Sequence, residues 1–232
     1  MRNVVGSHPD ARLEMVRWTA RIGVVTAPSL ARYEGTTVAS AHGRLLAAER
    51  AGLLTGCRVL AGLPALFTVT RAGLRAAAVS GIAPARVSAA GARHAIACAD
   101  AAAALAGAFP DHVVSGEREL RRDERAYGAA LASARVAHAG SGARLHRPDL
   151  VLWPSAGGAL PVAVEVELTV KAPRRLLEIC GAWARCRCVS GVVYLLTPET
   201  RVPVARALEH AHAAAQVVLV DLDALLAAPE GG

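Results

Sequence analysis

Hydrophobic residues in the first 80 positions recur first at helical spacing and then in short apolar runs. Apolar positions three and four apart predict helices, and polar caps, proline and glycine set the expected helix ends. Two apolar runs on either side of the turn Gly62-Leu63-Pro64 predict a β-hairpin. The expected elements are helices at 13–22, 27–34 and 37–51, strands at 53–60 and 65–69, and a helix at 71–78.

From residue 112 onward, strand-like apolar runs alternate with helical spacing, which predicts an α/β domain with a mixed central sheet. The expected strands are 112–115, 148–153, 162–170, 189–196 and 216–220, and the expected helices are 117–139, 173–185 and 203–213. The Ala- and Gly-rich stretch between the two patterns contains a predicted helix at 93–108, and we expect it to be a connector packed on the second domain. The expected domains are therefore 1–80, 81–111 and 112–228.

The order helix, helix, helix, hairpin, helix resembles a winged helix-turn-helix, in which the third helix lies in the major groove of DNA. On that helix the spacing places Val38, Leu45 and Leu46 toward the core. The residues expected to face DNA are Thr37, Ser40, Ala41 and Arg44 on the helix and Arg58 on the hairpin. A small helical domain that binds another protein is the alternative.

Charge is unevenly distributed along the chain. Residues 1–80 carry ten arginines and four acids, a net charge of +6, whereas the whole chain carries +7. A basic first third favours a polyanionic partner, here double-stranded DNA, although the charge also serves solubility. With 52 alanines, and Lys171 as the single lysine among 26 basic residues, the composition is typical of a GC-rich genome.

The chain has no apolar run that predicts a membrane span and no signal-peptide pattern at its start. We therefore expect a cytoplasmic protein without membrane contact. The five cysteines are expected to be reduced thiols. Cys180, Cys186 and Cys188 suggest a zinc site only weakly, because no Cys/His pair at a complementary spacing accompanies them.

Two acidic residues interrupt an otherwise apolar strand. In the run 162–168 the valines point to one face, and Glu165 and Glu167 point to the other, about 7 Å apart. A hairpin with the preceding strand would bring Asp149 beside Glu165. Three carboxylates form a set of hard oxygen ligands suited to Mg²⁺, with Mn²⁺ as a substitute. The alternative is that both glutamates lie on the solvated face of an edge strand.

The pattern Pro148-Asp149, a spacer of 15 residues, then Glu165-Val166-Glu167 resembles the core of the PD-(D/E)XK nuclease superfamily. The resemblance implies that Asp149 and Glu165 bind magnesium. It also implies that Glu117, at the start of the preceding helix, is a further acidic metal ligand. Glu167 stands where most members have the lysine that assists the attacking water, and Lys171 is the candidate to replace it if the strand extends that far. The alternative for Lys171 is a surface residue at a helix start, and the charges at 119–124 are expected to form a solvated helix face.

Together, the two predicted domains resemble the replication-relaxation family of actinobacterial plasmids and mobile elements. That resemblance implies DNA handling, and it leaves open whether the nuclease-like domain is a magnesium-dependent endonuclease. The rival hypothesis is a non-catalytic DNA-binding regulator or replication accessory protein, which the absent standard lysine favours. A third is a protein-interaction module in a mobilisation complex, and a homodimer is a further expectation.

Overall fold

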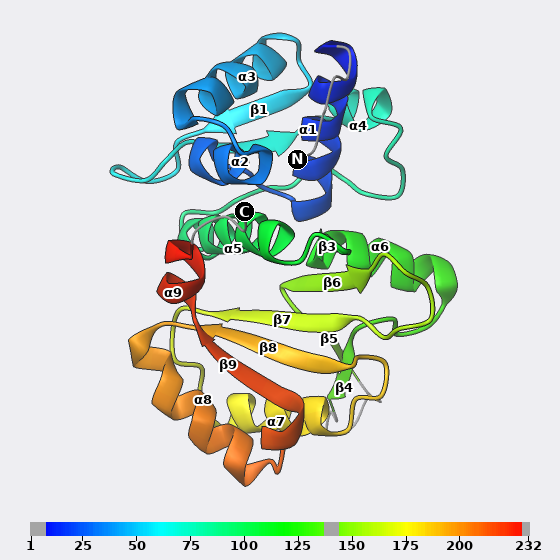
Figure 1. Ribbon diagram of the computed structural model, residues 1–232, viewed down its shortest axis with the longest axis vertical. Helices are drawn as coiled ribbons and strands as arrows, with labels where there is room; N and C mark the ends of the chain where they lie inside the picture. Colours follow the sequence, from blue (N-terminus) through cyan, green and yellow to red (C-terminus); the bar gives the residue numbers. More distant parts are fainter. Residues whose placement is uncertain (1–7, 137–143, 229–232) are drawn as a thin grey trace. The chain divides into compact units, whose positions relative to one another are not determined.

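The computed structural model describes residues 8–136 and 144–228, and the chain divides into two compact units, residues 1–103 and 104–232 (Figure 1). Within the described ranges, no helix is long and apolar enough to cross a membrane.

The first unit contains the predicted order of helix, helix, helix, hairpin and helix. Its elements are α1 (His8–Ile22), α2 (Ala27–Glu34), α3 (Val38–Arg50), β1 (Leu54–Cys57), β2 (Leu66–Val69) and α4 (Arg71–Ala76). Strands β1 and β2 pair antiparallel, as predicted. Val25 adds a third segment through two backbone hydrogen bonds to Phe67, at 3.0 and 2.8 Å.

Local chemistry explains the ends of these helices. Thr26 and Ser29 form a capping box at the start of α2, and Gly35 ends α2 in the left-handed conformation with φ of 62°. Thr70 caps α4 by accepting a hydrogen bond from Gly73 N. A Cβ at Gly73 would lie 2.1 Å from the Leu53 carbonyl oxygen, so α4 packs directly on the backbone that precedes β1.

The orientation predicted for α3 is wrong at several positions. Ala41 is fully buried with Leu45 and Ala48, whereas Val38 and Leu46 are 50% and 38% exposed. The buried stripe therefore follows 41, 45 and 48, because two alanines let α3 approach the core closely around one leucine. The larger apolar residues are left on the outside.

The connector was expected to pack on the second domain, and for its first half this is wrong. Ala92, at the start of α5 (Ala92–Ala108), is buried in an apolar cluster with Val24 and Leu66 of the first unit. Val87 and Ile96 pack on the same cluster. The division between the units falls inside α5, which matches the helix predicted at 93–108 closely.

The second unit contains the mixed sheet, in the order β3-β6-β7-β8-β9. Its strands are β3 (His112–Gly116), β6 (Leu150–Pro154), β7 (Val162–Glu167), β8 (Gly191–Leu196) and β9 (Val217–Asp221). The pairs β3–β6 and β6–β7 are antiparallel, and β7–β8 and β8–β9 are parallel. Strand β7 is therefore the middle strand, with a partner on each side (Figure 1).

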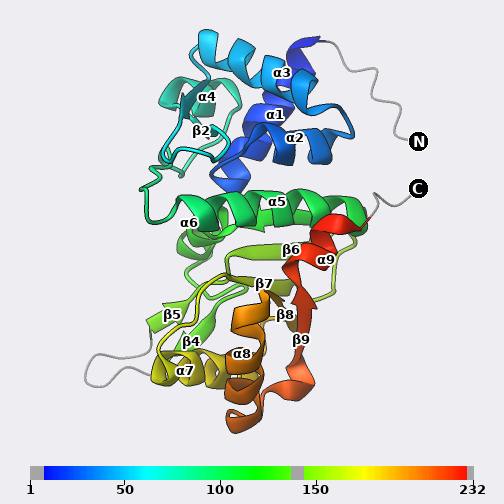
Figure 2. The same cartoon turned by 90° about the vertical axis from the view of Figure 1, so that its left-hand side faces the viewer.

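Helices α7 (Pro173–Ala184) and α8 (Pro198–His210) lie together by this sheet (Figure 2). Ala163 of β7 and Tyr194 of β8 belong to the same buried cluster as Trp183 of α7 and Val204 of α8. Because side chains alternate along a strand, Glu165 and Glu167 share the face of Ala163. The fold thus directs both glutamates to the side on which α7 packs.

One predicted helix is longer than the helix in the structure. A helix was expected at 117–139, but α6 (Glu117–Tyr127) ends at Gly128, whose φ of 69° is left-handed. Strand β4 (Ala134–Val136) then pairs with β5 (Arg144–His146), and Ala134 and Val136 are buried. Burial against the second unit's core outweighs the helix propensity of this Ala-rich stretch. Positions 137–139 of the predicted helix lie outside the described residues.

Other boundaries differ too, among them the start of α1 at His8 and the end of β1 at Cys57. Strand β7 ends at Glu167 instead of continuing to 170. Helix α8 begins at Pro198, five residues before the predicted start, because Thr197 and Thr200 form a capping box and Pro198 fits the first turn. Pro203 therefore lies inside α8 rather than at its start, and a short α9 (Leu222–Ala227) follows β9.

Candidate active site

The β6–β7 hairpin places Asp149 beside Glu165, as the sequence predicted. Leu150 pairs with Val164 in antiparallel register, so the preceding residue, Asp149, comes opposite Glu165. Asp149 Oδ2 accepts a hydrogen bond from the Val166 backbone N–H at 2.8 Å. This bond fixes the Asp149 side chain against β7, next to Glu165.

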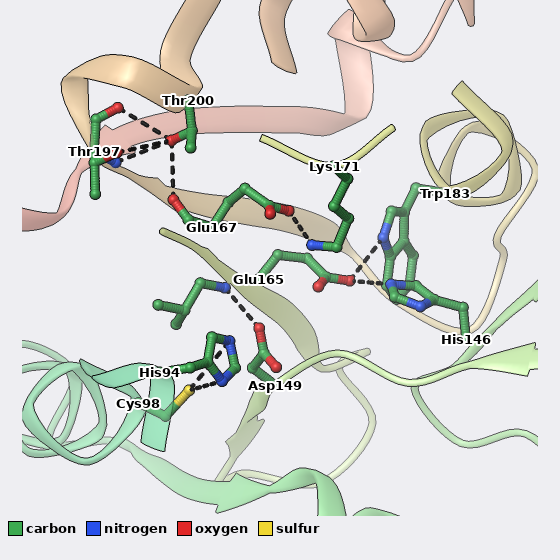
Figure 3. A network of polar contacts seen from close by, with 11 residues as sticks. His94, Cys98, His146, Asp149, Glu165, Glu167, Lys171, Trp183, Thr197 and Thr200 are labelled. Atoms are coloured by element: carbon green, nitrogen blue, oxygen red, sulfur yellow. Dashed lines mark hydrogen bonds and ion pairs between the residues drawn. The ribbon is translucent and has the colours of Figure 1, made fainter. Parts of the chain in front are cut away.

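Glu165 is a buried carboxylate, 3% exposed, between two ring donors (Figure 3). His146 Nε2 lies 2.6 Å from Glu165 Oε1, and Trp183 Nε1 donates to the same oxygen at 3.1 Å. Burial raises the pKa of Glu165, and the nearby Asp149 charge raises it further, whereas His146 and Lys171 lower it. Glu165 thus titrates as part of a group of charges.

Glu167 is equally buried, at 3% exposed, and pairs with Lys171 (Figure 3). The strand ends at Glu167, so the extension of β7 that would have placed Lys171 on the strand face of Glu165 does not occur. The three intervening positions instead return the ammonium to the carboxylate of Glu167. Thr200, in the first turn of α8, donates from Oγ1 to the Glu167 carbonyl oxygen at 2.9 Å and so ties this strand end to α8.

The solvated edge-strand alternative is therefore wrong. Strand β7 is central, and both glutamate side chains are buried, Glu165 against His146 of β5 and Trp183 of α7. A buried carboxylate is costly unless it has hydrogen-bond donors or an opposite charge. Glu165 has two hydrogen-bond donors, and Glu167 has the opposite charge of Lys171.

The backbone of Glu117 is hydrogen-bonded to the backbone of Asp149. Its N–H donates to the Asp149 carbonyl oxygen at 3.1 Å, so α6 begins next to the start of β6. The Glu117 side chain is 43% exposed and pairs with Arg121 one turn along α6. The resemblance implied that Glu117 is a third metal ligand. To take that role, its carboxylate would have to break the ion pair with Arg121.

Sequence reasoning missed His146 and Trp183. Trp183 was counted as an apolar residue of its helix, and its indole N–H gives no sequence signal. His146 lies three residues before Asp149 in a strand that was not predicted. A histidine and an arginine directly before Pro148-Asp149 were the available clue.

Glu124 was also misplaced on a solvated helix face. It is 4% exposed, accepts from Leu131 N at 3.1 Å and pairs with Arg147 Nε at 2.8 Å. Since Arg147 follows His146, this pair holds β5 against α6 and helps to position His146 at Glu165.

The predicted DNA-contacting residues of the first unit separate into two groups. Ser40 and Arg58 are exposed, and so is Thr37, which caps α3 by accepting from Ser40 N at 3.2 Å. Arg44 does not face outward: it pairs with Glu34 of α2 and donates to the Ala11 carbonyl oxygen at 3.1 Å. Arg44 therefore ties α3 to α1 and α2, and its expected outward position is wrong. The exposed residues of α3 at helical spacing are Ala39, His42, Gly43, Leu46 and Arg50.

The donors at β7 suit a hard divalent cation in type, but the ligand oxygens of Asp149, Glu165 and Glu167 do not all lie within 4.8 Å of one another. Asp149, Glu165 and Glu167 contribute carboxylate oxygens, the ligands that Mg²⁺ and Mn²⁺ prefer. Lys171 is an ammonium that pairs with Glu167, so the three carboxylates carry more negative charge than this lysine balances. A divalent cation between Asp149 and Glu165 would offset that excess.

No protein-family model matches the chain, and neither the curated proteins nor the solved structures give a match.

Proposed function

We propose that the chain acts on double-stranded DNA. Its first unit would bind the duplex as a winged helix-turn-helix. Its second unit would be a PD-(D/E)XK nuclease-like domain that hydrolyses phosphodiesters with magnesium. The observation that carries this proposal is the pair Asp149 and Glu165 at facing positions of β6 and β7, beside the ion pair of Glu167 with Lys171.

The first unit supports the DNA-binding half. The exposed face of its third helix includes the short residues Ala39 and Gly43 and the polar His42 beside the apolar Leu46. The short residues permit the close approach that a major-groove helix needs. Arg58 is exposed between β1 and β2, where a wing would reach a phosphate. The net charge of +6 on residues 1–80 adds a sequence-independent attraction to the phosphate backbone.

In the second unit each side chain of the group would have a defined role. Asp149 and Glu165 would hold the cation, which when bound polarises a phosphate oxygen and supports formation of hydroxide. His146 and Trp183 would keep Glu165 in a fixed orientation by their bonds to Oε1. Lys171, held by Glu167, would place an ammonium near the reacting phosphate and the attacking water.

A non-catalytic DNA-binding regulator is the second candidate, and one observation favours it. Asp149, Glu165 and Glu167 all have protein partners: a backbone N–H, two ring N–H donors and an ammonium. A polar network satisfied in this way stabilises the fold without a cation.

Plasmid cleavage with the full chain separates the two candidates. Supercoiled plasmid is incubated with the protein and Mg²⁺ or Mn²⁺, and Asp149→Asn and Glu165→Gln are compared with the wild type. Both substitutions keep a hydrogen-bond acceptor but remove the charge. Glu178→Gln is the matched control, because Glu178 is a half-exposed partner of Arg174 and Arg175 on α7.

We expect cleavage by the wild type and by Glu178→Gln, and a loss of at least about 100-fold in the other two variants. The metal should also raise the melting temperature of the wild type but not that of Glu165→Gln. Absence of both cleavage and a metal-dependent shift in the wild type would reject the nuclease and leave the regulator.

A further inference from the structure

Two cysteines lie together in the connection between α7 and β8. The Sγ atoms of Cys186 and Cys188 are 3.3 Å apart. Both sulfur atoms also approach the Ser133 carbonyl oxygen, at 3.9 and 3.6 Å. The two thiols are therefore oriented toward each other on one side of residues 185–190.

This pair borders an open hollow of about 600 Å³. The hollow is lined by both cysteines, by Ser133 and by the arginines Arg135, Arg185 and Arg187, among others. The hollow therefore opens beside both cysteines, of which Cys186 is 6% exposed. Of the three arginines that line the hollow, Arg187 lowers the pKa of Cys186 by its charge.

The two thiols differ in acidity. The hydrogen bond from Cys188 lowers the pKa of Cys186 to about 6, with a smaller contribution from Arg187, while burial opposes the shift. The same hydrogen bond raises the pKa of Cys188 far above its ordinary value. Cys186 is therefore the more acidic of the two thiols, and the hydrogen bond that it shares with Cys188 stabilises its thiolate form.

Cys180, another buried cysteine, has a raised pKa where Cys186 has a lowered one. Burial raises the pKa of Cys180 to about 11, which keeps Cys180 protonated and unreactive. Cys57, which is exposed on β1, offers an internal reference for an ordinary accessible thiol.

We propose that Cys186 and Cys188 form a site of reversible oxidation by hydrogen peroxide, with Cys186 as the attacked thiolate and Cys188 as the resolving thiol. The Cys186 sulfur attacks one peroxide oxygen, the O–O bond breaks and hydroxide leaves, which gives a sulfenic acid. The Cys188 sulfur then attacks the Cys186 sulfur. The S–S bond forms, the S–O bond breaks and the thiol proton leaves with the oxygen as water. Peroxide accepts the two electrons that the sulfur atoms lose.

Closure of this disulfide needs little movement. The sulfur atoms must approach by only about 1.3 Å to reach the bond length of about 2.05 Å. Only one residue, Arg187, separates the two cysteines, so the ring is small and a dithiol reductant should reopen it.

The test treats the reduced full-length protein with stoichiometric hydrogen peroxide and then alkylates the remaining thiols. Peptide mapping should show Cys186 and Cys188 protected from alkylation, joined with loss of two hydrogen atoms, while Cys57 and Cys180 remain alkylatable after unfolding. Dithiothreitol should restore both alkylation sites. This arm uses only the wild type, so it does not depend on the folding of any variant.

Two serine variants assign the roles. Cys188→Ser should accumulate a sulfenic acid at Cys186 that dimedone traps, and Cys186→Ser should react at least about tenfold more slowly at Cys188. Oxidation of Cys57 before the Cys186–Cys188 pair in the wild type would overturn the proposal. So would equal dimedone labelling of the two serine variants.

Discussion

At the scale of single residues, the ion pair of Glu167 with Lys171 has the clearest consequence. Lys171 is the single lysine of the chain, and its partner is a buried carboxylate on the central strand. Removal of the ammonium leaves that carboxylate without its opposite charge. Lys171 therefore affects folding as well as any chemistry, unlike an ordinary surface lysine.

We expect Lys171→Met to lower the free energy of unfolding by about 1–3 kcal/mol, a value between those of exposed and buried ion pairs because Lys171 is partly exposed. The double variant Glu167→Gln/Lys171→Met removes both charges and should recover most of that loss. Urea denaturation of both proteins, followed by circular dichroism, measures the difference.

Activity assigns the role of Lys171. If its ammonium assists cleavage, the double variant should stay at least about tenfold below the wild type in the plasmid assay despite its recovered stability. Recovery of cleavage together with stability would show that Lys171 only balances the charge of Glu167.

Gly43 on α3 allows a test of whether the exposed face of this helix contacts DNA, as we propose. A Cβ there would meet no atom within 4 Å, so Gly43→Glu and Gly43→Arg should both fit and should gain up to about 1 kcal/mol of helix propensity. The two variants differ only in charge. We expect Gly43→Glu to weaken duplex binding at low salt by about tenfold or more and Gly43→Arg to retain it, as measured by fluorescence anisotropy.

Gly43→Ala is the control for the change in helix propensity and should bind as the wild type does. Equal affinities for the glutamate and arginine variants would show that this face of α3 does not contact DNA. Arg44 is not suited to this test, because its loss would disturb the packing of α3 on α2.

At the scale of elements, α5 carries a carboxyl group with an unusual pKa. Burial raises the pKa of Asp100 to about 6, and Arg32 only partly opposes this shift. The folded protein therefore binds a proton more tightly than the unfolded chain does. Stability is fully present below the unfolded pKa near 3.8 and falls as pH rises toward 6.

We expect the wild type to lose up to about 3 kcal/mol of unfolding free energy through this group between pH 4 and pH 6.5. Asp100→Asn cannot titrate and should show a smaller loss over the same interval. Urea denaturation at both pH values measures the difference. Equal losses in the two proteins would contradict the assignment of this pH dependence to Asp100.

Elements with strong local signals could be predicted from the sequence. Helix α2 was bounded by Thr26 and Gly35, and the β1–β2 hairpin and the five strands of the mixed sheet followed from apolar runs and turns. The short β4–β5 pair could not, because this Ala-rich segment has no strand signal of its own and depends on nonlocal packing, here of β4 on α7. The same nonlocality hid the contacts of Glu165 with His146 and Trp183.

At the scale of the whole molecule, chemistry and charge are divided between the two units. The first third carries nearly all of the net positive charge, and the buried pair Glu165 and Glu167 lies in the second unit. The positions of arginines and acidic residues along the sequence were enough to locate the net positive charge in the first third. The carboxylates were recognised from strand alternation and a short motif, but their burial depended on β7 being the middle strand.

The position of β7 also has a consequence for the order of folding. Its antiparallel partner β6 is a near neighbour in sequence, whereas β8 pairs with it across α7, with Val162 opposite Gly191. Short-range pairing closes a smaller loop and forms faster, so the β6–β7 hairpin should precede the parallel pair. In that early hairpin Glu165 and Glu167 are still hydrated. The cost of burying their charges is therefore met late, when α7 and β8 dock, and changes at these two residues should alter the unfolding rate more than the folding rate.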